Sequence, residues 1–142
     1  MSQLGLVLLS LFLSLSSSLT ENIEKAFLQN NPRLFYPLFS AEQPINISLP
    51  EPISFSDQLT REQSFFLFQN IFSTYTTFEF FPESNGQSSP DKDHFIFKAR
   101  WSFLNKNKSQ FVFLIFFYIR RSPGASRAGD FWKITEIKAE KL

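Results

Sequence analysis

One stretch of the chain, QFVFLIFFYIR from Gln110 to Arg120, is almost entirely apolar and contains four phenylalanines. Its aromatic and β-branched side chains favour a pleated strand. A strand with one face in water alternates apolar with polar residues, and this stretch does not alternate. We therefore predict a strand that is covered on both of its faces.

The segments around this strand change from a helical period to a period of two. The alternating stretches are TTFEFF, HFIFKARWSFL and FWKITEIKA, and the connections NGQSSPDKD, NKNKS and SPGASRAG are rich in turn-forming residues. Short turn-rich connections join antiparallel strands. From Thr76 to the end, the sequence therefore predicts an antiparallel meander.

Helical signals precede the meander. An apolar stripe at Ile23, Phe27 and Leu28 predicts a helix that stops before Pro32, because proline disfavours the helical conformation in the residue before it. A short helical turn is expected between Leu34 and Phe39. A second helix, from Thr60 to Tyr75, opens with a capping box and carries apolar residues at helical spacing, namely Phe65, Phe68, Ile71 and Phe72.

A short alternating stretch lies between the two helical regions. Ile45, Ile47 and Leu49 alternate with polar residues, and Pro50 and Pro52 follow closely. Proline cannot donate a hydrogen bond to a neighbouring strand, so it is confined to edge strands and turns. We expect this stretch to be an edge strand followed by a turn.

The helices are sufficient to cover one face of the sheet. The other face would then expose an apolar patch of several hundred Å², a size that usually marks an interaction site. Its residues would be Leu114, Phe116, Tyr118, Ile96 and either Trp132 or Ile134. At about 25 cal/mol per Å², covering such a patch is worth on the order of 10 kcal/mol before association entropy. The sequence predicts a homodimer through this face. Lys and Arg stems of adjacent strands, or an N-terminal segment, are the alternative covers.

The first residues have the character of an export signal. Leu4 to Leu15 is an apolar run of about a dozen residues, shorter than the roughly 20 needed to span a membrane. Small residues follow, so we expect cleavage near Ser18 and a single domain over residues 19–142 with no stable membrane span. Against this interpretation, no Lys or Arg precedes Leu4, and a buried N-terminal helix is the alternative.

The amino-acid composition limits the cellular compartment and the kinds of partner that we expect. The chain has no cysteine, whereas small secreted domains of complex cells are usually stapled by disulfides, so a bacterial periplasmic or extracellular protein is expected. A net charge of +1 argues against a nucleic-acid partner. The charge is divided unevenly: three basic residues face eight acidic ones up to Pro90, and eleven face five from Asp91 onward. We interpret the second half as strands with solvated Lys and Arg; a face for an anionic partner is the alternative.

The order of elements resembles the nuclear transport factor 2-like group of cystatin-like folds. The stretches SFSDQLTREQSFFLFQNIFSTYTTFEF and DFWKITEIKAEKL are similar to those of a family of short exported bacterial proteins of unknown function. The resemblance implies an α+β fold, with N-terminal helices packed on the concave face of a curved antiparallel meander sheet. It also implies a pocket in the resulting cone and pairing through the sheet. It transfers no catalytic residue.

Residues that could carry chemistry are few. His94 is the single histidine, beside Asp91 and Asp93, and no glycine-rich loop precedes a helix. If the cone held an isomerase or dehydratase site, the base would be Asp57, Glu79 or His94, with Tyr75 or Tyr118 as hydrogen-bond donor. Their spacing singles out none of them, so we assign no catalytic, metal or cofactor residue and predict no cofactor.

The function predicted from the sequence is therefore an exported, non-enzymatic binding or interaction module. It would associate with itself, or with an envelope protein, through the sheet face that includes Ile96, Leu114, Phe116 and Tyr118. The alternative is a carrier of a small apolar ligand, or an isomerase or dehydratase, that uses the concave pocket.

Overall fold

A computed structural model of the protein describes residues 18–83, 93–122 and 132–142. Residues 18–28 are helical. The elements that follow are η1 (Pro32–Leu34), η2 (Tyr36–Leu38), β1 (Ile45–Leu49), β2 (Phe55–Leu59), α2 (Arg61–Thr74), β3 (Thr76–Pro82), β4 (His94–Leu104), β5 (Gln110–Arg121) and β6 (Trp132–Lys141). Most of the predicted signal segment lies outside the described residues. Ser18, near which cleavage is predicted, is already helical.

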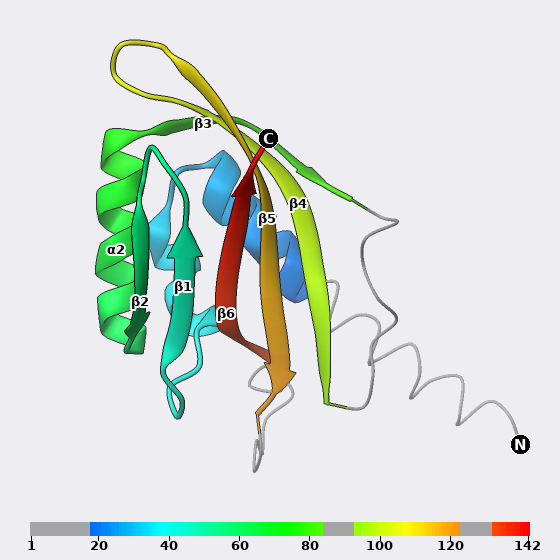
Figure 1. Cartoon of the computed structure of the whole chain (residues 1–142). Helices are drawn as coiled ribbons and strands as arrows, with labels where there is room; N and C mark the ends of the chain where they lie inside the picture. Colours follow the sequence, from blue (N-terminus) through cyan, green and yellow to red (C-terminus); the bar gives the residue numbers. More distant parts are fainter. Residues whose placement is uncertain (1–17, 84–92, 123–131) are drawn as a thin grey trace, which may run out of the picture.

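The strands form one six-stranded sheet in the order β2-β1-β6-β5-β4-β3. Strands β3 to β6 pair antiparallel with their neighbours, so the predicted meander is confirmed. The last strand, β6, also pairs in parallel with β1, which joins the β1–β2 hairpin to the meander. The helices of the described residues lie on one side of this curved sheet (Figure 1), as expected for the predicted α+β class. We call the opposite side of the sheet the outer face.

The prediction that the stretch at Ile45 forms an edge strand is wrong. β1 lies between β2 and β6, and the edge is β2, a strand that the sequence analysis did not identify. The two prolines do not interrupt β1, because they fall in the turn of the hairpin, where Ile53 N–H donates to the Pro50 carbonyl. The alternation of β1 is as expected, with Ile45, Ile47 and Leu49 buried.

Aromatic rings fill the space between the helices and the inner face of the sheet. Phe27, on the first helix, lies at the centre of this core and is completely buried. Its ring centroid is 4.6 Å from that of Phe80 and 4.9 Å from that of Trp101. Phe117 of β5 lies 5.7 Å from it on the same side. Within the described residues, side chains therefore occupy the concave side of the sheet.

Asn30 connects three elements where the first helix ends. Its φ of 49° is in the left-handed region, which Asn adopts more readily than most residues. Its side-chain Nδ2 donates to the carbonyls of Phe72 and Tyr75 at 3.0 and 2.9 Å, and its Oδ1 accepts from the N–H of Thr77. One side chain thus binds the end of α2 and the start of β3 to the first helix.

Candidate functional site

The four predicted interface residues lie together on the outer face of the sheet: Ile96, Leu114, Phe116 and Tyr118. We call these four residues the outer patch. Ile96 is directly opposite Tyr118 in the register of β4 and β5. All four have intermediate exposure, whereas the inward-facing residues of the same stretch of β5 are completely buried. The described chain therefore covers the inner side of β5 fully and its outer side partly.

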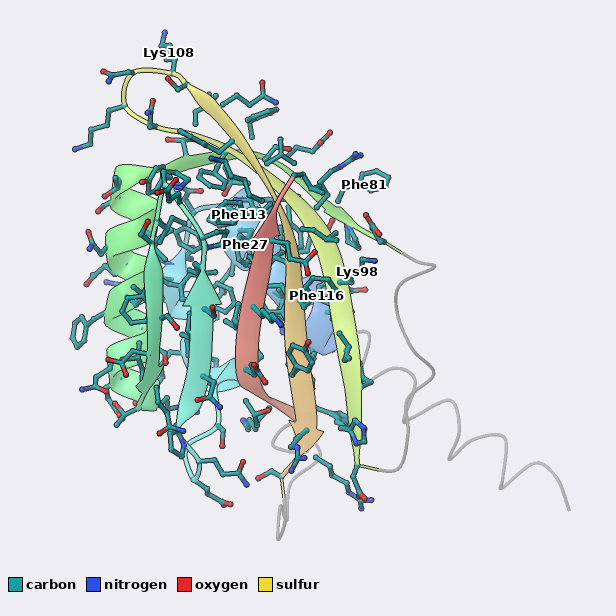
Figure 2. The ribbon with its side chains drawn as sticks, viewed as in Figure 1. Phe27, Phe81, Lys98, Lys108, Phe113 and Phe116 are labelled. Carbon is teal, nitrogen blue, oxygen red and sulfur yellow. The ribbon has the colours of Figure 1, made fainter. Side chains whose placement is uncertain are left out.

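Part of the outer cover comes from basic side chains of the adjacent strand. The ammonium of Lys98 lies 5.6 Å from the centroid of the Phe116 ring and 3.6 Å from a carboxylate oxygen of Glu83. Figure 2 shows Lys98 and Phe116 close together on this face. Arg100 covers the exposed Phe81 in the same way, at 5.9 Å. Cover by Lys and Arg stems, one of the alternatives expected from the sequence, is thus present around the outer patch.

Two further residues proposed for this patch are not on it. Trp132 is 7% exposed and Ile134 is 0% exposed, and both belong to the buried core. The register of β5 and β6 shifts between Tyr118 and Ile119, which places Glu136, rather than an apolar residue, beside Tyr118. On β6 the outer positions are therefore charged.

The register defines a grid of charges around the outer patch. Lys98 and Lys138 lie on either side of Phe116, on β4 and β6. Arg100 and Glu140 lie on either side of Leu114, and Ile96 and Glu136 on either side of Tyr118. Basic Arg100 and acidic Glu136 therefore occupy diagonally opposite corners around an apolar centre, while Ile96 and Glu140 occupy the other two corners.

A shallow hollow borders the patch at the end of β5 near residue 120. Its volume is about 280 Å³, and its lining includes His94, Ile96, Tyr118, Arg120 and Glu136. His94, Arg120 and Lys133 form one row across three strands at this end. The outer face thus combines a hollow beside Tyr118 with a protruding ring at Phe81, which is 56% exposed.

A second concave feature lies on the helical side of the molecule, between the 3-10 turns and α2. Its volume is about 420 Å³, and it is lined by Arg33, Tyr36, Glu62, Phe65 and Phe66. We call it the aromatic groove. The helical spacing of Phe65, Phe68, Ile71 and Phe72 did not reveal it. Phe65 is half-buried, whereas the other three are buried, and Ser64 is fully buried.

The residues considered for acid-base chemistry do not meet in the core. Asp57 on β2, Glu79 on β3 and His94 at the start of β4 are all exposed. Tyr75 donates its hydroxyl hydrogen to the Pro52 carbonyl at 3.4 Å, and Tyr118 belongs to the outer patch. Asp91, proposed beside His94, lies outside the described residues.

The described residues contain neither a metal-binding cluster nor a membrane-spanning helix. No group of three or more His, Asp or Glu side chains in residues 18–83, 93–122 and 132–142 is close enough to hold a metal ion. No helix in those ranges has the length and apolar character needed to cross a membrane.

Comparison with known proteins identifies the fold of this chain through solved structures. No family model matches the chain, and no curated protein matches it. Among solved structures, it is similar to a ketosteroid isomerase-like protein from Erwinia carotovora atroseptica, with 12% identity, a TM-score of 0.65, and coverage of 89% of this chain and 92% of that one.

Two other solved structures differ in their described roles. A putative dehydratase of the NTF2-like family from Streptomyces avermitilis shares 13% identity with a TM-score of 0.63, covering 92% of this chain and 95% of that one. The CaMKII hub of S. rosetta shares 9% identity with a TM-score of 0.60, covering 91% and 95%. Proteins with this fold are thus described both as a putative enzyme and as an assembly hub. The chain has the nuclear transport factor 2-like fold.

Proposed function

We propose that the protein is an association module that pairs with a second copy of itself through the outer face of its sheet. The observation that carries this proposal is the incomplete cover of the outer patch, set against the complete burial of the inner side of the same strand. Lys98 covers Phe116 from one side. A second sheet would remove the remaining apolar surface from water, which is the main driving force for such pairing. The likeness in fold to a CaMKII hub is compatible with assembly.

The grid of charges favours one orientation of two identical faces. If the two-fold axis ran parallel to β5, Arg100 would meet the partner's Glu140, but Lys98 would meet the partner's Lys138. If the axis were perpendicular to β5, Glu136 would meet the partner's Glu140. Like charges placed opposite each other oppose association.

A crossed arrangement removes both of these repulsions and leaves one like-charge contact, between the two Glu140 side chains at the edge of the interface. With the two-fold axis running diagonally through Phe116, Arg100 of each copy lies opposite the partner's Glu136, so two ion pairs form. Lys98 then lies over the partner's Tyr118 ring, and the two Phe116 rings meet at the axis. Neighbouring strands are about 4.8 Å apart, and alternate residues along a strand are about 6.8 Å apart. These two spacings are similar enough for a corner residue of one sheet to lie over the diagonally opposite corner residue of the other. Orthogonal packing is one of the two usual ways in which sheets face each other.

The protruding Phe81 fits this arrangement. It lies one strand beyond Arg100, since Phe81 and Arg100 are register partners. Exchange about the same diagonal places it over the partner's β6 near Glu136 and Lys133, at the edge of the hollow of about 280 Å³. Each copy would insert one ring, so the contact is reciprocal, as two-fold symmetry requires.

Native mass spectrometry and sedimentation of residues 19–142 across micromolar concentrations test the proposal. We expect a dimer mass for the wild type and a monomer mass for Phe116→Lys. Lys106→Glu, in the exposed hairpin turn between β4 and β5, is the matched charge change away from the patch and should leave the dimer intact. A monomer at every concentration for the wild type would overturn the proposal.

Charge exchange tests the orientation separately. Arg100→Glu and Glu136→Arg should each weaken the dimer, and the double variant should restore it, because the pair is reformed in reverse. Equal weakening by all three variants would reject the crossed arrangement while leaving pairing through this face in place.

We also propose that the protein acts after export from a bacterial cell, in the periplasm or outside it. The apolar run from Leu4 to Leu15 and the small residues up to Ser18 support this proposal. Leu19 is 6% exposed within the core, so the folded domain requires the chain from about that residue onward. Mass spectrometry of the protein recovered from periplasmic and medium fractions should find an N-terminus near residue 19. Recovery of the uncleaved chain from the cytoplasm would contradict export.

A further inference from the structure

The aromatic groove is a second concave surface, separate from the outer face. It lies where η1 and η2 meet the first turns of α2 (Figure 1) and is formed by five residues from these elements. Its volume of about 420 Å³ falls within the range of small-molecule sites, roughly 300–1,000 Å³. Phe66 is 61% exposed at its rim, which is unusual for so large an apolar side chain.

Three rings form the apolar walls at near-perpendicular angles. The Tyr36 and Phe65 centroids are 6.0 Å apart with the rings at 89°, and those of Phe65 and Phe66 are 5.3 Å apart at 69°. A flat ligand lying against them could stack on one ring and meet the edge of another, the geometry that aromatic pairs prefer. The walls are therefore shaped for an aromatic or similarly flat apolar group.

Tyr36 is held in place from behind. The Arg61 guanidinium carbon lies 4.5 Å from the centroid of its ring, and Arg61 Nε donates to the Tyr36 carbonyl at 3.0 Å. The Tyr36 hydroxyl donates to Glu62 Oε1 at 3.0 Å. Because these contacts fix the ring before any ligand arrives, binding would cost little additional ordering.

The charges at the groove favour an anion. Arg33 and Arg61 are two of the three basic residues up to Pro90, and both are located here. Arg61 is engaged with the Tyr36 and Pro37 carbonyls, and Glu62 accepts from the Tyr36 hydroxyl. For Arg33, the backbone N–H donates to Asn31 Oδ1, while its guanidinium has no acceptor within hydrogen-bond distance among residues 18–83, 93–122 and 132–142.

We infer that the aromatic groove binds a small amphipathic carboxylate. The apolar body would lie among Tyr36, Phe65 and Phe66, and the carboxylate would accept hydrogen bonds from the Arg33 guanidinium, which matches a carboxylate with two parallel donors. A cationic ligand would instead lie beside Arg33, while Glu62, the acidic residue of the lining, already accepts from the Tyr36 hydroxyl. This inference does not rest on self-association, since none of the five residues belongs to the outer patch.

Titration of isotope-labelled protein with naphthoate, followed by NMR, tests this inference. We expect saturable shifts at the backbone amides of Arg33, Phe65 and Phe66. The neutral analogue naphthamide should bind at least about tenfold more weakly, since it lacks the charge that strengthens the Arg33 hydrogen bonds. Equal affinity for the two probes, tighter binding of naphthylmethylammonium, or shifts confined to the outer face would overturn the inference.

Three variants separate the parts of the site. Arg33→Gln should lower the affinity for naphthoate about tenfold and leave that for naphthamide unchanged. Phe66→Ala should weaken both probes. Lys25→Gln, an exposed basic residue of the first helix outside the groove, is the matched control and should change neither. Unchanged naphthoate affinity in folded Arg33→Gln, as checked by circular dichroism, would reject the role of Arg33. Phe116→Lys should retain naphthoate binding, whatever the fate of the dimer.

Discussion

The two faces of β5 are built from similar residues but differ in their surroundings. On the inner face, Phe113, Ile115, Phe117 and Ile119 are all 0% exposed beneath the helices. On the outer face, Leu114, Phe116 and Tyr118 keep intermediate exposure beside Lys98, Lys138 and the acidic residues of β6.

The apolar surfaces on the two faces of β5 therefore have different roles. The inner residues contact the aromatic core and stabilise the single chain, so their replacement should act on folding. The outer residues are only partly covered by the described part of the chain, so their replacement should act mainly on association. The four predictions that follow test this separation or sharpen it.

Phe117→Ala should have the largest effect. The Phe117 ring lies within 5.8 Å of the rings of Phe27 and Phe97, so the change leaves a cavity in the aromatic core. We expect the free energy of unfolding to fall by about 3–5 kcal/mol, as measured by urea denaturation at a concentration where the protein is monomeric. A loss below about 1 kcal/mol would mean that the inner face is less tightly packed than its burial indicates.

Asn30→Ala should come next. The variant loses three hydrogen bonds that join the first helix to α2 and β3, two of them to carbonyls with partial burial. We expect a loss of about 2–3 kcal/mol in unfolding free energy. Asn30→Gly is the control for the backbone, because glycine accepts the positive φ without cost. A fully stable Asn30→Gly would show that the conformation, and not the hydrogen bonds, is what Asn30 provides.

Thr77→Val should have a smaller effect, at the inner margin of the sheet. Trp101 Nε1 donates to Thr77 Oγ1 at 2.8 Å in a buried setting, and valine keeps the shape but removes the acceptor. We expect a loss of about 1–2 kcal/mol and a change in tryptophan fluorescence. Thr77→Ser keeps the acceptor and should preserve the fluorescence of the wild type.

Phe116→Ala should have the smallest effect on the monomer. We expect its unfolding free energy at low protein concentration to change by less than about 1 kcal/mol, since the ring is half-buried. The melting temperature of the wild type should rise with protein concentration, as it does for a dimer, and that of the variant should not. A loss as large as that of Phe117→Ala would remove the distinction between the two faces.

Helices and strands that are held by contacts between residues close in sequence could be predicted from local patterns. The capping box predicted at Thr60 is present, with Gln63 N–H donating to Thr60 Oγ1 at 3.2 Å and Thr60 N–H donating to Gln63 Oε1 at 2.9 Å. The strands of the meander follow from their period of two, and the position of the outer patch follows from the missing alternation in β5.

Features that depend on contacts distant in sequence could not be predicted in this way. The parallel pairing of β1 with β6 joins Ile47 to Ile137, and nothing in either segment marks the other as its neighbour. β2 reads FSDQL, with polar residues on both sides, because an edge strand has less surface to bury. The aromatic groove needs Tyr36 and Phe65 side by side, which only the packing of η2 against α2 achieves. Two adjacent phenylalanines at Phe65 and Phe66, more than a single buried stripe requires, were the available signal.

The central location of β6 has a consequence for when the protein can fold. β6 occupies the position between β1 and β5, yet it follows every other described strand in the sequence. Until β6 has left the ribosome, the hairpin of β1 and β2 has no neighbour in the sheet, and the meander lacks one of its four strands. We therefore expect the six-stranded sheet to be completed only after β6 has been synthesised, so that the earlier strands wait for a late partner.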